Sequence, residues 1–295
     1  MIYRVRHRTC YRYQQPVVLC YNAAHMLPRS TPLQTCLSSQ IQVHPRPAYG
    51  RRHEDYFGNT IYYFSIEESH DALEIEVVSD LQALDAARGP NLDFGVTCEQ
   101  ARQWLLAGRD HQTLLAREFL CDTAMVPCLD ALRAYAESCF APQRPLLSAV
   151  RDLTEKIFEE FIFDPEFSSV ATPLSDVLAH RRGVCQDFAH LAIGCLRALG
   201  FPARYMSGYI ETLPPPGQVK LVGADASHAW FAVYSPGEGW FEFDPTNNQL
   251  AGQQHITCAW GRDYADVPPL TGVIFGGGGD QTLTVEVDVM RLDRR

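Results

Sequence analysis

The stretch from residue 181 to residue 199 constrains the fold of this 295-residue chain more than any other feature. It places Cys185 at the first turn of a predicted helix, which Gly200 and Pro202 end. The apolar positions have the three-and-four spacing of a buried helical face: Phe188, Leu191, Ala192, Cys195, Leu196 and Leu199. A thiol at a helix N-terminus lies near the positive end of the helix dipole, which favours its ionised form. The stretch therefore predicts a nucleophilic cysteine on a buried helix.

A predicted β-hairpin downstream carries two residues that complement a thiol. Its strands lie on either side of a Gly- and Pro-containing turn at 235–239. Pairing of Tyr234 with Trp240 sets the register, and His228 then lies diagonally beside Asp244. These two share a polar face with Trp230 and Glu242. The other face is apolar: Ala229, Phe231, Val233, Phe241 and Phe243. A slip of one residue would separate the histidine from the carboxylate.

Cys185, His228 and Asp244 are the residue types needed for nucleophilic acyl transfer. The imidazole withdraws the thiol proton, and the carboxylate orients the imidazole. Each residue also has a structural interpretation, as a core cysteine, an ordinary strand histidine and an aspartate that starts a turn before Pro245. The helix-start position and the shared hairpin face favour the catalytic interpretation.

Four motifs in this order resemble the transglutaminase-like superfamily, and its bacterial proteins with an N-terminal β-domain are the nearest in pattern. The motifs are Gly183–Leu191, Gly200–Tyr205 with Gly208-Tyr209, Ser227–Trp230 and Phe243–Thr246. The resemblance implies an α+β, papain-like core in which a nucleophile helix packs on an antiparallel sheet. It also implies that Cys185, His228 and Asp244 are nucleophile, base and orienter. The superfamily includes cross-linkers, peptidases, amidases and inactive relatives, so the substrate stays open.

The expected function is thiol-dependent acyl transfer on amide bonds of proteins or peptides, through a thioester on Cys185. Attack by water gives a cysteine protease or amidase, which is the favoured interpretation. Attack by an amine gives a protein-glutamine transglutaminase. The alternative from another class is a non-catalytic interaction module with the same fold. The intact set of three residues argues against that alternative.

The chain divides into three predicted parts. Residues 1–85 are rich in alternating and β-branched residues and predict an antiparallel β-sandwich-like domain or partial barrel. Residues 86–145 predict helices, beginning with a capping box at Thr97 and Gln100. Residues 146–295 predict the catalytic core with a C-terminal strand. In the first part, arginines at every second position predict the solvent-facing side of a strand: Arg4, Arg6, Arg8 and Arg12.

Composition excludes several partners. The net charge of −10 lacks the basic footprint that nucleic-acid binding requires. The first residues carry charge at alternate positions and have no signal-peptide core, and no apolar run is long enough to span a membrane. A cytoplasmic location is therefore expected, and the expected partner is a protein or peptide substrate. The oligomeric state is left open.

No disulfide, metal or cofactor is expected. The ten cysteines lie singly, without a C-x-x-C pair, which predicts free thiols. A zinc site at Cys185, His190 and His228 is conceivable by residue type. However, the first two lie five residues apart on a helix and do not share a face, and no pair has a familiar ligand spacing. His190, like Asp187, is interpreted as a supporting residue.

Overall fold

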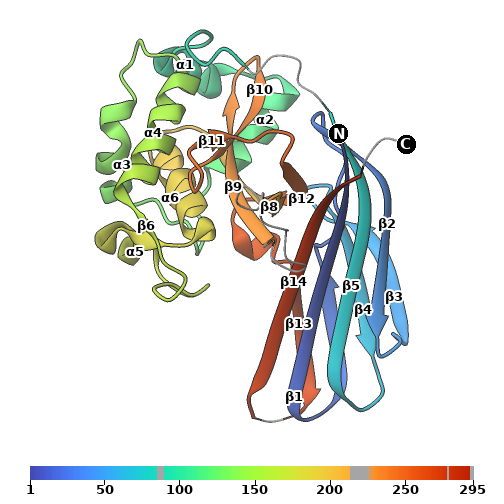
Figure 1. Cartoon of the computed structure of the whole chain (residues 1–295). Coiled ribbons are helices and arrows are strands. Elements are labelled where there is room, and N and C mark those ends of the chain that lie inside the picture. Colours follow the sequence, from blue (N-terminus) through green and yellow to red (C-terminus); the bar gives the residue numbers. More distant parts are fainter. Residues whose placement is uncertain (85–89, 213–224, 226, 278, 293–295) are drawn as a thin grey trace, which may run out of the picture.

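The computed structural model describes residues 1–84, 90–212, 225, 227–277 and 279–292 (Figure 1). A seven-stranded antiparallel sheet lies beside a five-stranded sheet whose other side is covered by helices. The strands of the large sheet are β1 (Ile2–Ala24), β2 (Gln34–His44), β3 (Tyr49–Glu54), β4 (Thr60–Ile66), β5 (His70–Ala83), β13 (Leu270–Gly276) and β14 (Gln281–Leu292). Those of the small sheet are β8 (Ala203–Ile210), β9 (Ser227–Ser235), β10 (Gly239–Asp244), β11 (Gln249–Leu250) and β12 (His255–Gly261).

The helices belong to the middle of the chain. They are α1 (Cys98–Ala107), α2 (His111–Ala116), α3 (Asp130–Ala136), α4 (Leu146–Glu160), α5 (Leu174–His180) and α6 (Cys185–Ala198). Among the 3-10 helices, η1 (Arg117–Leu120) follows α2, η2 (Glu137–Cys139) follows α3, and η3 (Tyr264–Asp266) follows β12. The short strand β6 (Ile162–Phe163) pairs with β7 (Arg182–Gly183). The predicted capping box at Thr97 and Gln100 is present at the start of α1. None of the helices in the described part of the chain has the length and apolar character needed to cross a membrane.

The large sheet is organised around β1, which doubles back on itself (Figure 1). Its first half pairs with β5 and β14, its second half pairs with β4 and β13, and the register breaks between Arg12 and Val17. Buried side chains of β4 and β5 form one apolar cluster with those of β1: Val17, Cys20, Phe64, Ile66, Leu73, Ile75 and Val77. Arg4, Arg6 and Arg8 of β1 form cross-strand ion pairs with carboxylates, such as Arg4 with Asp80 at 2.7 Å, as expected for a side of the sheet that faces solvent.

The C-terminal strands join the N-terminal sheet. Along β1, β14 pairs from Ile2 to Tyr13 and β13 pairs from Val17 to Ala24. The sequence division at residue 146 assigned this segment to the catalytic core, and hydrogen bonding assigns it to the other sheet. Local strand pattern cannot identify a partner strand more than 250 residues away, because alternation specifies a face and not a neighbour.

The small sheet and the helices share one hydrophobic core. Helix α6 is almost entirely buried and packs against β9 through the apolar hairpin face predicted from the sequence. Helices α1 and α3, which lie in the predicted helical segment, and α4, which follows it, contribute residues to the same cluster. Examples are Ala101, Leu132 and Leu153. The helices before residue 146 are therefore continuous with the core that holds α6.

Two amide side chains from the large-sheet region close the free edge of β12. Gln34 donates to the Thr257 carbonyl at 2.7 Å and accepts from the Thr257 N–H at 2.9 Å. Asn59 does the same for Trp260, at 2.8 and 3.0 Å. An amide presents one donor and one acceptor, as a neighbouring strand would, so the edge of β12 is satisfied without another strand.

Asn59 ends a hairpin loop that is longer than its sequence pattern indicates. A Gly-Asn pair between strands is typical of a two-residue turn, but β3 and β4 are joined by five residues, with Glu54 opposite Thr60. The Asp55 carboxylate accepts from the Phe57 and Asn59 backbone N–H groups at 2.9 and 2.7 Å. This side-chain capping stabilises the longer loop and orients Asn59 toward β12.

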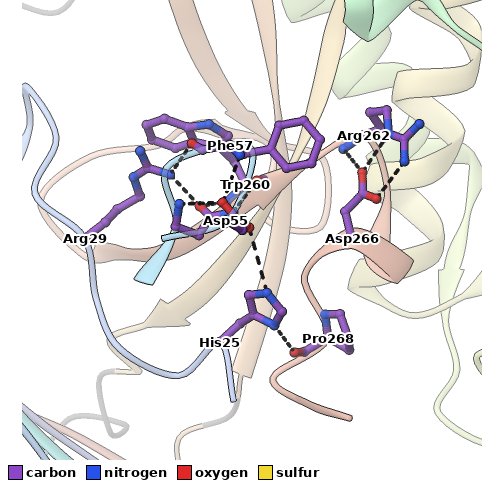
Figure 2. Close-up of polar contacts among 9 residues, drawn as sticks. His25, Arg29, Asp55, Phe57, Trp260, Arg262, Asp266 and Pro268 are labelled. Atoms are coloured by element: carbon purple, nitrogen blue, oxygen red, sulfur yellow. Dashed lines mark hydrogen bonds and ion pairs between the residues drawn. The ribbon is translucent and has the colours of Figure 1, made fainter. Parts of the chain in front are cut away.

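The segment after β1 connects this loop with β12 and with the chain that follows β12 (Figure 2). The Arg29 guanidinium lies 3.2 Å from the centroid of the Trp260 ring, and it donates to the Phe57 carbonyl. His25 approaches the Pro268 carbonyl through Nδ1 at 3.0 Å. Arg262 and Asp266 form an ion pair at 2.9 Å. These contacts fix the path of the chain from β12 to β13.

We expect Gly208→Ala to lower the free energy of unfolding by about 3 kcal/mol, because a Cβ there would overpack the sheet. Gly208 lies in β8 between β9 and β12, and a Cβ would lie 1.9 Å from the Ile256 carbonyl oxygen. Urea denaturation measures the change. Gly252→Ala is the control, since a Cβ at Gly252 meets no atom within 4 Å. Equal stabilities of the two variants would contradict the prediction.

Candidate active site

The start of α6 presents the thiol. Cys185 is the first residue of the helix and is partly exposed. The Asp187 carboxylate accepts from the Val184 backbone N–H at 2.8 Å and from the Ser168 hydroxyl, which fixes the first turn. Gly183 makes room for this carboxylate, because a Cβ there would lie 2.7 Å from Asp187 Oδ2. Burial raises the pKa of Asp187, and the two hydrogen bonds oppose that rise.

The hairpin of β9 and β10 has the predicted register, with Tyr234 opposite Trp240. His228 and Asp244 therefore lie on one face, and His228 Nε2 is 2.8 Å from Asp244 Oδ2. Both residues are buried, and Asp244 has no exposed surface. Trp230, on the same face, donates from its indole to Glu242 at 2.8 Å.

The Asp244 carboxylate accepts hydrogen bonds at both oxygens. Oδ1 accepts from the backbone N–H groups of Thr246 at 2.9 Å and Asn247 at 3.3 Å. Oδ2 accepts from the Asn247 side-chain amide at 2.7 Å and lies 3.0 Å from His255 Nε2. Burial alone would raise the pKa of Asp244, but hydrogen bonds from His228, His255 and Asn247 outweigh it and hold the pKa well below its usual range. Asp244 is therefore a carboxylate at neutral pH.

His228 links the carboxylate to the thiol. Burial lowers the pKa of His228, but hydrogen bonds and charges from Asp244 and Cys185 outweigh burial and raise it to about 9. Because Nε2 is directed at Asp244, Nδ1 is the ring nitrogen left for the sulfur. A positively charged imidazole between a carboxylate and a cysteine is an arrangement in which a thiol can be activated as a nucleophile.

His190 is a residue of α6, and its side chain is buried in the core with contacts of its own. Its Nε2 accepts from the Tyr264 backbone N–H at 3.1 Å, and its ring packs on Tyr205 with centroids 5.0 Å apart. Burial lowers the pKa of His190 to about 3, so it is neutral. The three residues of the zinc alternative thus have separate surroundings, and His190 supports the loop after β12.

One buried cluster in the described residues has the donor types of a metal site: His228, Asp244 and His255. The distances of 2.8 and 3.0 Å from the two Nε2 atoms to Asp244 Oδ2 fit hydrogen bonds, and the Asn247 amide takes a further position on that oxygen. Hydrogen bonds to Asp244 therefore account for the spacing of these three residues. Sequence reasoning did not single out His255 or Asn247, and the one available signal was a histidine directly before the run at 256–260, which forms β12 in the structure.

A cavity of about 360 Å³ lies beside the first turns of α6. It begins one residue from Cys185, at Gln186, and His190 also lines it. The remaining wall is largely apolar: Met125, Leu129, Val170 and Leu174. Its one carboxylate is Asp187, which already accepts from Val184 and Ser168.

The sequence matches two protein-family models. Residues 3–82 match the bacterial transglutaminase-like N-terminal region, and residues 133–245 match the transglutaminase-like superfamily. An uncharacterized protein of Mycobacterium tuberculosis is 40% identical over 297 residues, which cover 98% of this chain and 92% of that protein. A protein-glutamine gamma-glutamyltransferase of Pseudomonas aeruginosa is 40% identical over 67 residues, which cover 22% of this chain and 10% of that enzyme.

A solved structure has the same fold along the whole chain. It is a protein of Cytophaga hutchinsonii described as a candidate cysteine protease, with a TM-score of 0.76 and 22% identity. The match covers 100% of this chain and 92% of that one. The fold is therefore a mixed α/β, papain-like core joined to an antiparallel N-terminal sheet, as the sequence predicted. The chain belongs to the transglutaminase-like superfamily, and it carries the N-terminal region of the bacterial members.

Proposed function

We propose that this protein is a thiol-dependent acyl-transfer enzyme that acts on amide bonds of proteins or peptides. Cys185 is the nucleophile, His228 the acid–base group and Asp244 the orienting carboxylate. The observation that carries the proposal is the buried contact of 2.8 Å between His228 and Asp244, with the thiol at a helix start interacting with the same histidine. Membership of the superfamily supports the general class.

The chemistry follows from these positions. The Cys185 thiolate attacks the amide carbonyl carbon, and the oxyanion accepts from a backbone N–H of the first helical turn, which has no partner within the helix. Imidazolium His228 gives a proton to the leaving nitrogen as the C–N bond breaks, leaving a thioester on sulfur. Neutral His228 then removes a proton from the incoming water or amine, whose attack breaks the C–S bond and releases the product. Asp244 stabilises the imidazolium formed in each cycle.

Hydrolysis is the favoured outcome over transfer to an amine. The cavity that begins at Gln186 has a largely apolar wall, and its carboxylate is already hydrogen-bonded to Val184 and Ser168. A lysine ammonium would lose hydration there without gaining a free anionic partner. Water needs no such site.

We expect hydrolysis to exceed amine incorporation when peptide substrates are incubated with a labelled primary amine at about 1 mM. Mass spectrometry measures the two products in one reaction, and Cys185→Ala provides the background. Incorporation that outruns hydrolysis would replace the peptidase or amidase assignment with the transglutaminase one. Absence of any Cys185-dependent product across glutamine-amide and peptide substrates would favour the non-catalytic module.

A further inference from the structure

His255 lies at the first position of β12, 11 residues beyond Asp244, with its side chain 3% exposed. The Gly252 backbone N–H donates to His255 Nδ1 at 3.2 Å. Nδ1 is therefore an acceptor, which places the hydrogen of a neutral ring on Nε2. Nε2 lies 3.0 Å from Asp244 Oδ2, so the tautomer set by Gly252 is the one that donates to the carboxylate.

We propose that His255 is a positioning residue of the active site, which holds the Asp244 carboxylate in the plane that aligns His228. This inference rests on the proposed function. The backbone N–H groups of Thr246 and Asn247 fix Oδ1, but they leave the carboxylate free to turn about that oxygen. Donors at Oδ2 remove this freedom, and His255 supplies one from a different strand.

Packing keeps the His255 ring in place. The ring meets Trp230 edge to face, with centroids 5.2 Å apart, and Trp230 in turn lies against His228 at 5.9 Å. The His255 backbone N–H donates to the Gly252 carbonyl at 2.9 Å. A buried aromatic ring with both nitrogens engaged has one low-energy orientation, so its donor is fixed before substrate binds.

The position of His255 depends on the large sheet. Two residues along β12, Thr257 is held at both its N–H and its carbonyl by Gln34. The strand that carries His255 is thus fixed from one side by β8 and from the other by an amide of the N-terminal region. Through His255, the N-terminal region contributes to the alignment of Asp244. The N-terminal region thus has a role in the site as well as in packing.

The test compares His255→Leu, His255→Gln and the control His53→Leu, at an exposed histidine of β3. For His255→Leu we expect kcat to fall about 10- to 100-fold with KM nearly unchanged, because a misaligned base slows the chemical step and leaves ground-state binding intact. Gln retains an N–H donor and should recover most of the loss. The control should match the parent. Circular dichroism and the melting temperature establish the folded fraction of each variant.

A folded His255→Leu with parental kcat, or a His255→Gln as slow as His255→Leu, would overturn the inference while the proposed function stands. If the parent cleaves no amide in a Cys185-dependent manner, the proposed function fails instead. In that case, or if the variants do not fold, ¹⁵N NMR of the parent tests directly whether His255 donates to Asp244. A His255 ring with its proton on Nε2 and a coupling across the hydrogen bond to Asp244 supports the inference, and a proton on Nδ1 overturns it.

Discussion

Cys185→Ala should lower the turnover of amide substrates by about 10⁵-fold or more, because it removes the atom that forms the thioester. The substitution should leave the fold intact, since Cys185 is partly exposed at a helix start. Cys195→Ala is the matched control on the same helix. Cys195 is fully buried, and burial raises its pKa, so it should contribute nothing to turnover. Turnover that survives Cys185→Ala would exclude the proposed mechanism.

The same thiol should be alkylated first among the ten cysteines. His228 has its pKa raised to about 9, so it carries its positive charge at neutral pH and stabilises a thiolate beside it. Alkylation of Cys185 should therefore persist below neutrality in the parent, and His228→Ala should shift it to higher pH. Iodoacetamide at stoichiometric amounts between about pH 5 and 9, read by mass spectrometry, measures this order. Faster labelling of another cysteine, or an unchanged profile in His228→Ala, would contradict the ion pair.

Asp244→Asn should lower kcat by about 10⁴-fold, the second-largest effect that we expect. The amide removes the charge that stabilises imidazolium His228, and its NH₂ group would face donors from His255 or from the Thr246 and Asn247 backbones. Asp266→Asn is the control, because that carboxylate pairs with Arg262 outside the site. Measurement of kcat and KM at neutral pH distinguishes lost chemistry from lost binding. A loss confined to KM would remove Asp244 from the orienting role.

Stability provides an independent check on the charges of this pair. The pKa of Asp244 is lowered on folding, so its contribution to stability is present above the ordinary carboxyl range and is lost as the pH falls below it. The pKa of His228 is raised from 6.5 to about 9, so its contribution is complete below pH 6.5 and disappears as the pH rises to about 9. The free energy of unfolding of the parent, measured in urea, should fall at both ends of this pH range. Asp244→Asn should show a weaker dependence on pH at both ends. A parent whose stability rises between pH 6.5 and 9 would contradict these charges.

The sequence predicted the parts of the site that local pattern can specify. The thiol at the start of α6 follows from helix spacing and stop signals around Cys185. The alignment of His228 with Asp244 follows from alternation once Tyr234 pairs with Trp240, because a hairpin joins strands that are close in sequence. The papain-like core with an N-terminal antiparallel sheet, inferred from four motifs, is the observed fold.

Only the tertiary structure decided which distant segments meet. Periodicity specifies the face of a strand but not its neighbour, so nothing local predicted that β13 and β14 pair with β1. The same holds for His255, whose donor role depends on a contact across two strands of the small sheet and on the Gly252 turn. The amides of Gln34 and Asn59 read as ordinary polar residues, and they gain a function because folding sets them against the free edge of β12. Sequence determines the chemistry that each residue offers, and tertiary packing determines which partner that chemistry reaches.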